Sequence, residues 1–228
     1  MNSRPSTTGR RPRVGVDVAA LRALRVDAPD GFVDSVLDGL GLNDADHLVT
    51  VQSPAGDLFV AFNDDGISAV MPAALFDDDP EKFAVHHRRE SGRPLVAGNR
   101  PPTGLVAALR TGQATSLRYD LSGLSSFERA VLTKTLEIPS GEVRPYGWVA
   151  REIGRPRAVR AVGSALGRNP VPVLIPCHRV VRSDGHVGNY GLGVPMKRAL
   201  LSAEGVDLER LERLADAGVR FLGSDTTA

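Results

Sequence analysis

Cysteine and aromatic residues are scarce in this chain, and long apolar runs are absent. The single cysteine, Cys177, excludes disulfides within the chain and any zinc site built on several thiolates. No leading stretch has the character of a signal peptide or a membrane span, which predicts a cytoplasmic protein with no membrane partner. The 228 residues, 42% of them hydrophobic, are enough to bury the cores of one or two small domains.

A strong net charge is also missing, because the formal charge of the whole chain is only +1. That value alone predicts no nucleic-acid partner. The distribution is more informative. Residues 139–186 contain eight arginines, no lysine and three acidic residues, a local net charge of +5. The planar guanidinium fork of arginine suits bidentate contacts with phosphate, although an arginine-rich solvated face is the alternative interpretation.

The first residues of the chain carry few signals for a folded domain. Residues 1–13 lack apolar periodicity and predict a basic tail. Residues 14–42 predict a helical extension, with apolar stripes at helical spacing over 17–25 and 30–40. No chemistry is assigned to this region.

A small α/β unit follows. Three short β-type runs separated by turn residues predict an antiparallel meander: Leu48–Gln52, Leu58–Phe62 and Ile67–Met71. Helices are predicted at Pro80–Glu90, capped by Asp79, and at Gly104–Arg110. His86 and His87 are predicted to be surface residues and not metal ligands, since adjacent positions on a helix diverge.

A second, helical part begins near Ser125. Ser125 and Glu128 have capping-box spacing at the start of a helix that Pro139 ends. Helices at Tyr146–Ile153 and Arg157–Leu166, joined by a glycine-containing turn, have the helix-turn-helix pattern.

The second helix of this pair should present two different faces. Its inward face is predicted from Val159, Val162 and Leu166. Its polar stripe consists of Arg157, Arg160 and Ser164 at spacings of three and four, where a recognition helix carries its contacts.

Cys177 ends an apolar run and precedes a histidine. Pro172 and Pro176 disfavour the α region at the residues before them, so the run is expected to be extended and buried. A lone thiol beside an imidazole is a candidate nucleophile, and a buried, inert cysteine is the alternative. Neighbouring side chains diverge, so direct contact between Cys177 and His178 requires a tight turn, or a water must bridge them.

Four short motifs in order carry a resemblance to a known family. They are Arg160-Ala-Val-Gly163, Asn169-Pro170, Pro176-Cys-His-Arg-Val180 and Ala203-Glu-Gly205. From about Leu121 to Gly205, and more weakly over 48–120, the sequence resembles the O6-alkylguanine-DNA alkyltransferases, also called methylated-DNA–protein-cysteine methyltransferases.

The resemblance implies an α+β fold and a domain division. A ribonuclease H-like α/β domain would span residues 43–120. A winged-helix-like domain with the helix-turn-helix and the reactive cysteine would span 121–206, and 207–228 would form a C-terminal helix and tail. The implied partner is double-stranded DNA containing O6-alkylguanine, bound by a monomer.

The resemblance also implies the roles of four residues in the chemistry. Cys177 would accept the alkyl group, and His178 would take the thiol proton through a water. Glu204 would orient His178; it closes a predicted helix, where the helix dipole disfavours an anion. Tyr146 would protonate or hydrogen-bond the departing guanine, although a core aromatic is the alternative.

Further residues would bind DNA. Arg160 would fill the place of the flipped nucleotide, and Asn169 would connect the recognition helix to the active-site segment, although a simple Asn-Pro turn is the alternative. Arg157, Ser164, Arg179, Tyr190 and Gly191 are the remaining predicted contacts. Gly191 stands where relatives often carry serine, so only its backbone amide could bind the base.

The implied transfer is irreversible and occurs once per molecule, because no second cysteine can resolve a thioether. No metal or organic cofactor is expected. Whether O4-alkylthymine is also a substrate stays open. A non-catalytic alkyltransferase-like protein, which carries tryptophan at the position of Cys177, and a transcriptional regulator are the alternative classes.

Overall fold

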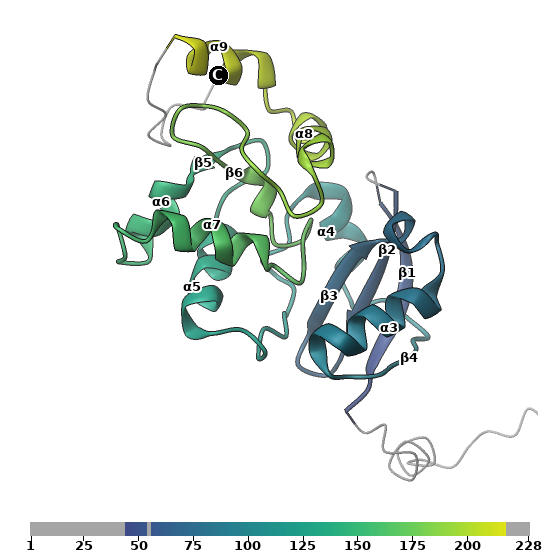
Figure 1. Ribbon diagram of the computed structural model, residues 1–228. Helices are drawn as coiled ribbons and strands as arrows, with labels where there is room; N and C mark the ends of the chain where they lie inside the picture. Colours follow the sequence, from purple (N-terminus) through teal and green to yellow (C-terminus); the bar gives the residue numbers. More distant parts are fainter. Residues whose placement is uncertain (1–43, 54–55, 218–228) are drawn as a thin grey trace, which may run out of the picture. The chain divides into compact units, whose positions relative to one another are not determined.

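The computed structural model describes residues 44–53 and 56–217. The chain divides into two compact units, Met1–Asn43 and Asp44–Ala228, and only the second contains described residues. The tail at 1–13, the helices predicted at 17–25 and 30–40, and the C-terminal tail from 218 therefore lie outside the described residues. Within the described residues a four-stranded sheet precedes a group of helices, so the predicted α+β class is confirmed (Figure 1).

The sheet has the strand order β3-β2-β1-β4. The strands β1 (Asp46–Ser53), β2 (Gly56–Phe62) and β3 (Ile67–Pro72) pair antiparallel in sequence order, which confirms the predicted meander. The sequence did not predict β4 (Leu95–Ala97), which pairs parallel with β1. Three residues between proline and glycine are too short to show the alternation that identifies a strand.

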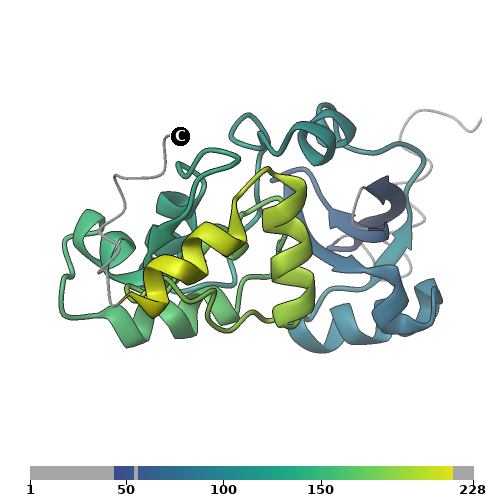
Figure 2. The same cartoon turned by 90° about the horizontal axis from the view of Figure 1, so that it is seen from above.

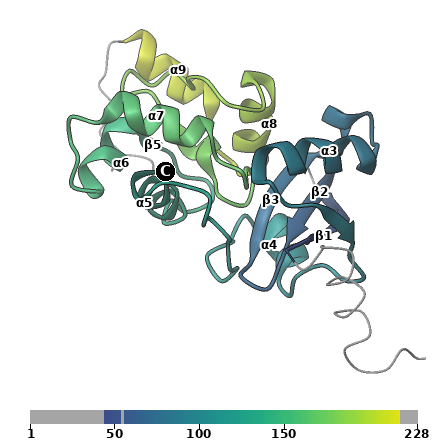
Figure 3. The same ribbon diagram turned by 60° about the horizontal axis from the view of Figure 1, so that its bottom comes forward.

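Helices lie on both faces of the sheet (Figure 3). The helix α3 (Pro80–Ser91) begins at the predicted cap Asp79, whose side chain accepts a hydrogen bond from the Glu81 amide. Residues of β2 alternate between the faces. Phe59 packs with Phe83 of α3, and Leu58 faces the cluster that contains α4 (Leu105–Thr111).

The helical half begins with α5 (Ser126–Thr135), where the predicted capping box is present. The helix α6 (Tyr146–Glu152) forms as predicted, but α7 (Val159–Gly167) starts two residues later than expected. Residues 155–158 form a turn closed by a hydrogen bond from the Ala158 amide to the Arg155 carbonyl. Pro156 has the second position of this turn, which its fixed φ suits.

The delayed start of α7 corrects two predictions. Arg157 lies in the turn and is not on the helix with Arg160 and Ser164. Val159, predicted to face inward, is 40% exposed, whereas Val162 and Leu166 are buried as expected.

The remaining elements surround the segment that contains Cys177. The two-residue strands β5 (Arg144–Pro145) and β6 (Val180–Val181) pair parallel on either side of a long crossover. The predicted helix before Gly205 is α8 (Val194–Ala203), and α9 (Leu208–Asp216) follows it (Figure 2). Leu211 of α9 is buried in a small cluster with Val143, Val181, Val187 and Leu201.

One hydrophobic core extends across both halves. The same cluster contains Leu58 and Val60 of the sheet, Leu132 of α5, and Val162 of α7. The backbone reinforces this continuity, because the Val70 amide of β3 donates to the Pro170 carbonyl over 2.9 Å. The domain boundary near residue 121 stays a prediction, since the core does not end there.

His87 is buried, which contradicts its prediction as a surface residue. It is 3% exposed, and its Nε2 lies 2.9 Å from Oδ2 of the fully buried Asp46. Burial alone would raise the pKa of Asp46, but hydrogen bonds from His87, Ser68 and Asn63 lower it below its usual value. His87 is thus buried because it pairs with a carboxylate at the start of β1, a distant partner that the local sequence of the helix does not reveal.

Replacement of the α5 cap should destabilise the chain measurably. Ser125→Ala removes the hydroxyl that accepts from the Glu128 amide, and the free energy of unfolding should fall by about 1 kcal/mol in urea titrations. Ser126→Ala, one residue into the same helix, is the matched control and should change it by less than about half as much. Equal losses in both variants would contradict the capping role.

Candidate active site

The apolar run before Cys177 is buried but not extended, which corrects the sequence prediction. The Ile175 amide donates to the Val171 carbonyl over 2.9 Å, and Val173 has a φ of 73°. A positive φ is a strained conformation for a β-branched residue. The two prolines fix their own φ and restrict the residues before them, so the chain is free to turn at Val173 and Leu174. A 3-10 turn, η2 (Cys177–Arg179), follows.

Asn169 holds the thiol of Cys177 in place. Its side-chain Nδ2 donates to Cys177 Sγ over 3.1 Å and to the Ile175 carbonyl over 3.0 Å. Its Oδ1 accepts from the Val171 amide over 3.0 Å. Asn169 therefore connects the end of α7 with both ends of the turn before the cysteine.

The thiol is protonated at rest and needs a base to react. Cys177 is 6% exposed, and burial raises its pKa, while the Asn169 amide and the Lys197 charge act in the opposite direction. Only the thiolate is a strong nucleophile. A neighbouring group must therefore accept the proton before or during attack.

His178 has the properties of that base. Its Nε2 lies 3.0 Å from Glu204 Oε1, and its Nδ1 is buried and makes no hydrogen bond within the described residues. Burial lowers the pKa of His178, so the ring is neutral at pH 7. Donation from Nε2 to the carboxylate assigns the free lone pair to Nδ1.

Arg179 lies behind this pair and does not face solvent. It is 2% exposed, and its Nε and Nη2 donate to both oxygens of Glu204 over 2.9 and 2.7 Å. Its remaining bonds go to the carbonyls of Ile138 and Gly112, at 2.6 and 2.8 Å. This placement contradicts the DNA contact expected for Arg179, since its donors are engaged and out of reach of a phosphate.

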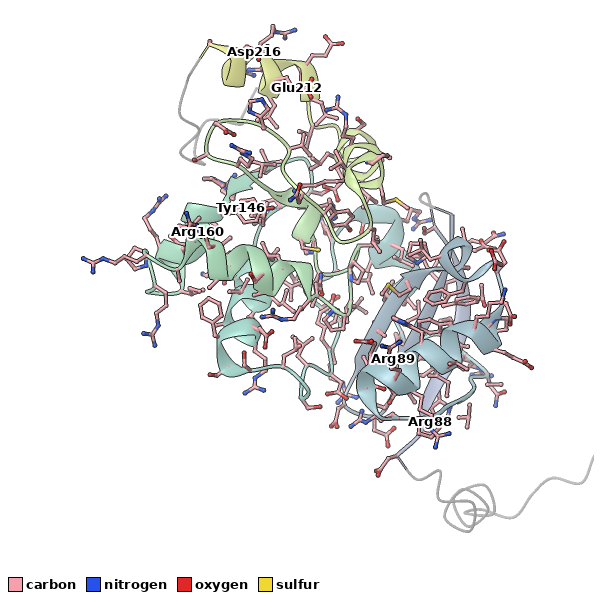
Figure 4. All side chains as sticks on the ribbon, viewed as in Figure 1. Arg88, Arg89, Tyr146, Arg160, Glu212 and Asp216 are labelled. Atoms are coloured by element: carbon pink, nitrogen blue, oxygen red, sulfur yellow. The ribbon has the colours of Figure 1, made fainter. Side chains whose placement is uncertain are left out.

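A cavity of about 510 Å³ opens above Cys177. Its walls come from α6, α7 and the segment between β6 and α8: Tyr146, Val159, Arg160, Gly163, Leu166, Gly167, Arg182, Gly188, Asn189, Tyr190 and Gly191. Figure 4 shows the labelled Tyr146 and Arg160 near one another on the helical half. Four glycines in the walls leave room that side chains would otherwise fill.

The predicted site residues fall into three groups. Tyr146, Arg160, Cys177, Tyr190 and Gly191 line the cavity itself. Four others, Asn169, His178, Arg179 and Glu204, support the cysteine from the protein interior. Arg157 and Ser164 are exposed and lie outside the cavity walls.

Lys197 is a site residue that the sequence interpretation missed. It is fully buried on α8, and its Nζ donates to the Val180 carbonyl over 2.6 Å and lies 5.9 Å from the centre of the Tyr146 ring. Burial lowers its pKa to about 8. Its burial could have been inferred from the spacing in the sequence, because Lys197 lies one helical turn before the buried Leu201 and therefore on the inward face of its helix.

Tyr190 contributes a second buried polar group. Its hydroxyl is buried, and its ring meets that of His178 edge to face, with centroids 6.3 Å apart. Burial and the nearby Cys177 raise the pKa of Tyr190, so the phenol stays protonated. The imidazole is thus fixed between an aromatic edge and a carboxylate.

The fold and the site together define a class of protein in which a buried thiol, next to a histidine–glutamate pair, lies at the base of a cavity. No group of three or more His, Cys, Asp or Glu among the described residues could hold a metal ion. No helix in the described ranges is long and apolar enough to cross a membrane.

Comparison with known proteins identifies the family. Residues 126–206 match the family model of the 6-O-methylguanine DNA methyltransferase DNA-binding domain. The methylated-DNA–protein-cysteine methyltransferase of Mycobacterium tuberculosis is 35% identical over 160 residues, which cover 69% of this chain and 92% of that protein. The rat protein of the same name is 48% identical over 111 residues, 48% of this chain and 52% of that one.

Solved structures agree with this result. The crystal structure of Mycobacterium tuberculosis OGT in complex with DNA has a TM-score of 0.55 and 30% identity, and the match covers 73% of this chain and 99% of that chain. The enzyme from Pyrococcus kodakaraensis, at 22% identity and a TM-score of 0.55, shares the fold. This chain belongs to the methylated-DNA–protein-cysteine methyltransferase family, and the resemblance found in its sequence is confirmed.

The carboxylate of Glu204 should make stability depend on pH in acid. Burial alone would raise the pKa of Glu204, but hydrogen bonds from His178 and Arg179 lower it from its ordinary 4.5 to about 2. A lowered carboxyl pKa stabilises the folded state above about pH 4.5, and this stabilisation is lost as the pH falls toward 2.

Glu204→Gln should therefore lose less stability than the unsubstituted chain between about pH 6 and pH 3, because it has no such carboxyl to protonate. Urea unfolding at several pH values measures the difference. Glu209→Gln, at an exposed carboxylate on α9, is the control and should follow the unsubstituted chain. Parallel curves for Glu204→Gln and the unsubstituted chain would contradict the assignment.

Proposed function

We propose that this protein repairs DNA by transferring an alkyl group, such as methyl, from the O6 atom of guanine to Cys177, irreversibly and once per molecule. The observation that carries the proposal is the position of Cys177 Sγ. It lies at the base of a cavity of about 510 Å³, 3.1 Å from the Asn169 amide and next in sequence to the paired His178.

The reaction begins at the thiol. His178 Nδ1 accepts the proton of Cys177 through a water, and Glu204 stabilises the imidazolium that forms. The thiolate then attacks the alkyl carbon in line with the bond to O6. A sulfur–carbon bond forms, the carbon–oxygen bond breaks, and its electron pair stays on guanine. The Asn169 amide and the Lys197 charge favour the thiolate against the cost of burial.

The other end of the cavity receives the leaving group. Tyr146 donates a hydrogen bond or a proton to the departing guanine, and the backbone amides of Tyr190 and Gly191 donate to O6. The cation of Lys197 lies near the Tyr146 ring and supports its loss of a proton. A neutral or hydrogen-bonded guanine is a better leaving group than a free anion.

Irreversibility follows from the product. The alkylated cysteine is a thioether, which does not leave under mild conditions, and the chain has no second cysteine to displace the group. Each molecule is consumed in one reaction, and neither a metal nor an organic cofactor is required.

Double-stranded DNA is the proposed partner. The Mycobacterium tuberculosis relative has been solved in complex with DNA. The local charge of +5 over 139–186 suits the phosphate backbone. Since O6 lies inside a base pair, the damaged nucleotide must be flipped out, at a cost of a few kcal/mol. Arg160, exposed on α7 at the rim of the cavity, takes the vacated place in the stack.

Further contacts with DNA come from the surface near Arg160. Arg157 in the turn and Ser164 on α7 are exposed on the predicted helix-turn-helix, where they can bind the backbone or the groove. Asn169 couples this helix to Cys177 through its hydrogen bonds. The proposed state is a cytoplasmic monomer, with a ribonuclease H-like first domain and a winged-helix-like second one.

A non-catalytic protein that binds alkylated guanine without repairing it is the second class considered. Such proteins carry tryptophan where this chain has Cys177, so the cysteine favours transfer. A regulator would need a further contact surface, and no observation in the described residues favours one.

Mass spectrometry of the intact protein tests the transfer. After mixing with a duplex that contains O6-methylguanine, the chain should gain one methyl group, and peptide mapping should place it on Cys177. Cys177→Ala should gain none while binding the duplex with an unchanged dissociation constant. Tight binding of damaged DNA by an unmodified chain would replace this proposal with the non-catalytic class.

Arg160→Ala tests nucleotide flipping. Transfer from O6-methylguanine in a duplex should slow by at least about tenfold, because the flipped state loses its wedge. Transfer from the free base O6-benzylguanine should change by less than about twofold, since no flipping is needed. Arg151→Ala, on α6 and outside the cavity walls, makes the same charge change as a control. Equal losses on both substrates would remove Arg160 from the flipping role.

A further inference from the structure

Arg182 follows β6 and lines the same cavity as Tyr146, although neither the sequence interpretation nor the proposed mechanism uses it. Its place relative to Tyr146 is defined by Gly188. The position that a Cβ atom of Gly188 would take lies 3.3 Å from Arg182 Cγ and 3.5 Å from Tyr146 Oη. The arginine stem and the tyrosine hydroxyl therefore flank one point on the cavity wall.

A tight turn fixes the guanidinium of Arg182 against the carboxylate of Asp184. The Arg182 amide donates to the His186 carbonyl over 2.9 Å, and the Gly185 amide donates to the Arg182 carbonyl over 3.1 Å. Asp184 in the turn accepts from Arg182 Nε at 3.0 Å and from Nη2 at 2.6 Å. One edge of the guanidinium is thus fixed, while Nη1 makes no hydrogen bond among the described residues.

The charge of Arg182 acts on the phenol. Burial raises the pKa of Tyr146 most, a negative charge on Cys177 raises it further, and Arg182 lowers it. Cys177 and Arg182 thus act on the pKa of Tyr146 in opposite directions. Cys177 is neutral once it carries the alkyl group, so the arginine then acts on Tyr146 without the opposing thiolate.

We infer that Arg182 is a positioning residue for the leaving group: its fixed positive charge stabilises the negative charge that develops on guanine and Tyr146 when the carbon–oxygen bond breaks. This inference rests on the proposed function. In the step concerned, the bonding pair moves from carbon to O6 and the purine ring, Tyr146 Oη gives its proton to the purine, and the phenolate that remains lies beside the cations of Arg182 and Lys197. No further reactant is required.

A phosphate contact is the other use that an exposed arginine at a DNA-binding cavity could have. The two roles can be distinguished by comparing two substrates, because the free base O6-benzylguanine has a leaving group but no phosphate. A charge that acts on the leaving group affects both substrates, whereas a phosphate contact affects only DNA.

Single-turnover kinetics of Arg182→Gln with free O6-benzylguanine and with a duplex containing O6-methylguanine test the inference. The maximal rate constant should fall about five- to tenfold on both substrates, while the half-saturating concentration of the free base should change by less than about twofold. Arg182→Lys keeps the charge and should stay within about twofold of the unsubstituted chain.

Arg168→Gln is the matched control. Arg168 is 61% exposed, as Arg182 is, and its Nε also binds one carboxylate, Glu128 at 2.6 Å, but it lies outside the cavity. Its substitution should leave the free-base reaction unchanged. The unfolding midpoint of Arg182→Gln should match that of the unsubstituted chain, since the side chain is on the surface.

Three results would overturn the inference: an unchanged free-base rate with a slower duplex reaction, an equal loss in Arg168→Gln, or a loss in Arg182→Lys as large as that in Arg182→Gln. The first would assign Arg182 to a phosphate. If any of these results is found while the unsubstituted chain still takes up the alkyl group, only the inference about Arg182 fails and the proposed function stands. An unsubstituted chain that takes no alkyl group from either substrate would overturn both.

Discussion

The arrangement of side chains beside Cys177 depends on one largely buried carboxylate, that of Glu204. Glu204 ends α8, where the helix dipole opposes a negative charge, yet it is ionised because His178 and Arg179 both donate to it. Without the carboxylate, the imidazole would lack the partner that sets its tautomer, and a buried guanidinium would lose its counter-ion. An unpaired buried charge of this kind is costly, so the three side chains must be placed together.

Two further hydrogen bonds connect the first half of the chain to the site. Arg179 also donates to the Gly112 carbonyl at the end of α4, and the Val70 amide of β3 donates to Pro170, next to Asn169. The first half of the chain therefore contacts the segment around Cys177 at two points. Most of the contact between the two halves is apolar, because one hydrophobic core continues from the sheet to the helices.

Local signals in the sequence were sufficient for much of the fold. The alternation in β1 to β3 and the spacing of Ser125 and Glu128 each identify an element within a few residues. They failed where a distant partner decides the outcome: β4 is a strand because β1 pairs with it, and His87 is buried because Asp46 accepts its hydrogen bond. Arg157 was misplaced because residues 155–158 close a turn before the helix begins at Val159.

The site shows the same division. Cys177, His178 and Glu204 were predicted together through the resemblance to a family, and the structure brings them to one centre. The inward direction of Lys197 and the internal bonds of Arg179 depend on how α8 and η2 pack, which spacing alone does not reveal. Long cationic side chains are most often on the surface, so their burial is the feature that sequence interpretation misses most readily.

Val173 gives the loop before the cysteine a particular mechanical character. Glycine would adopt its φ of 73° without strain, but it would also allow many other backbone conformations. In a β-branched residue this conformation lowers the stability of the fold, but the side chain also leaves the backbone few alternative conformations. The sulfur of Cys177 is therefore carried on a stiff support, and the restricted entropy of the backbone as well as the hydrogen bonds of Asn169 hold it in place.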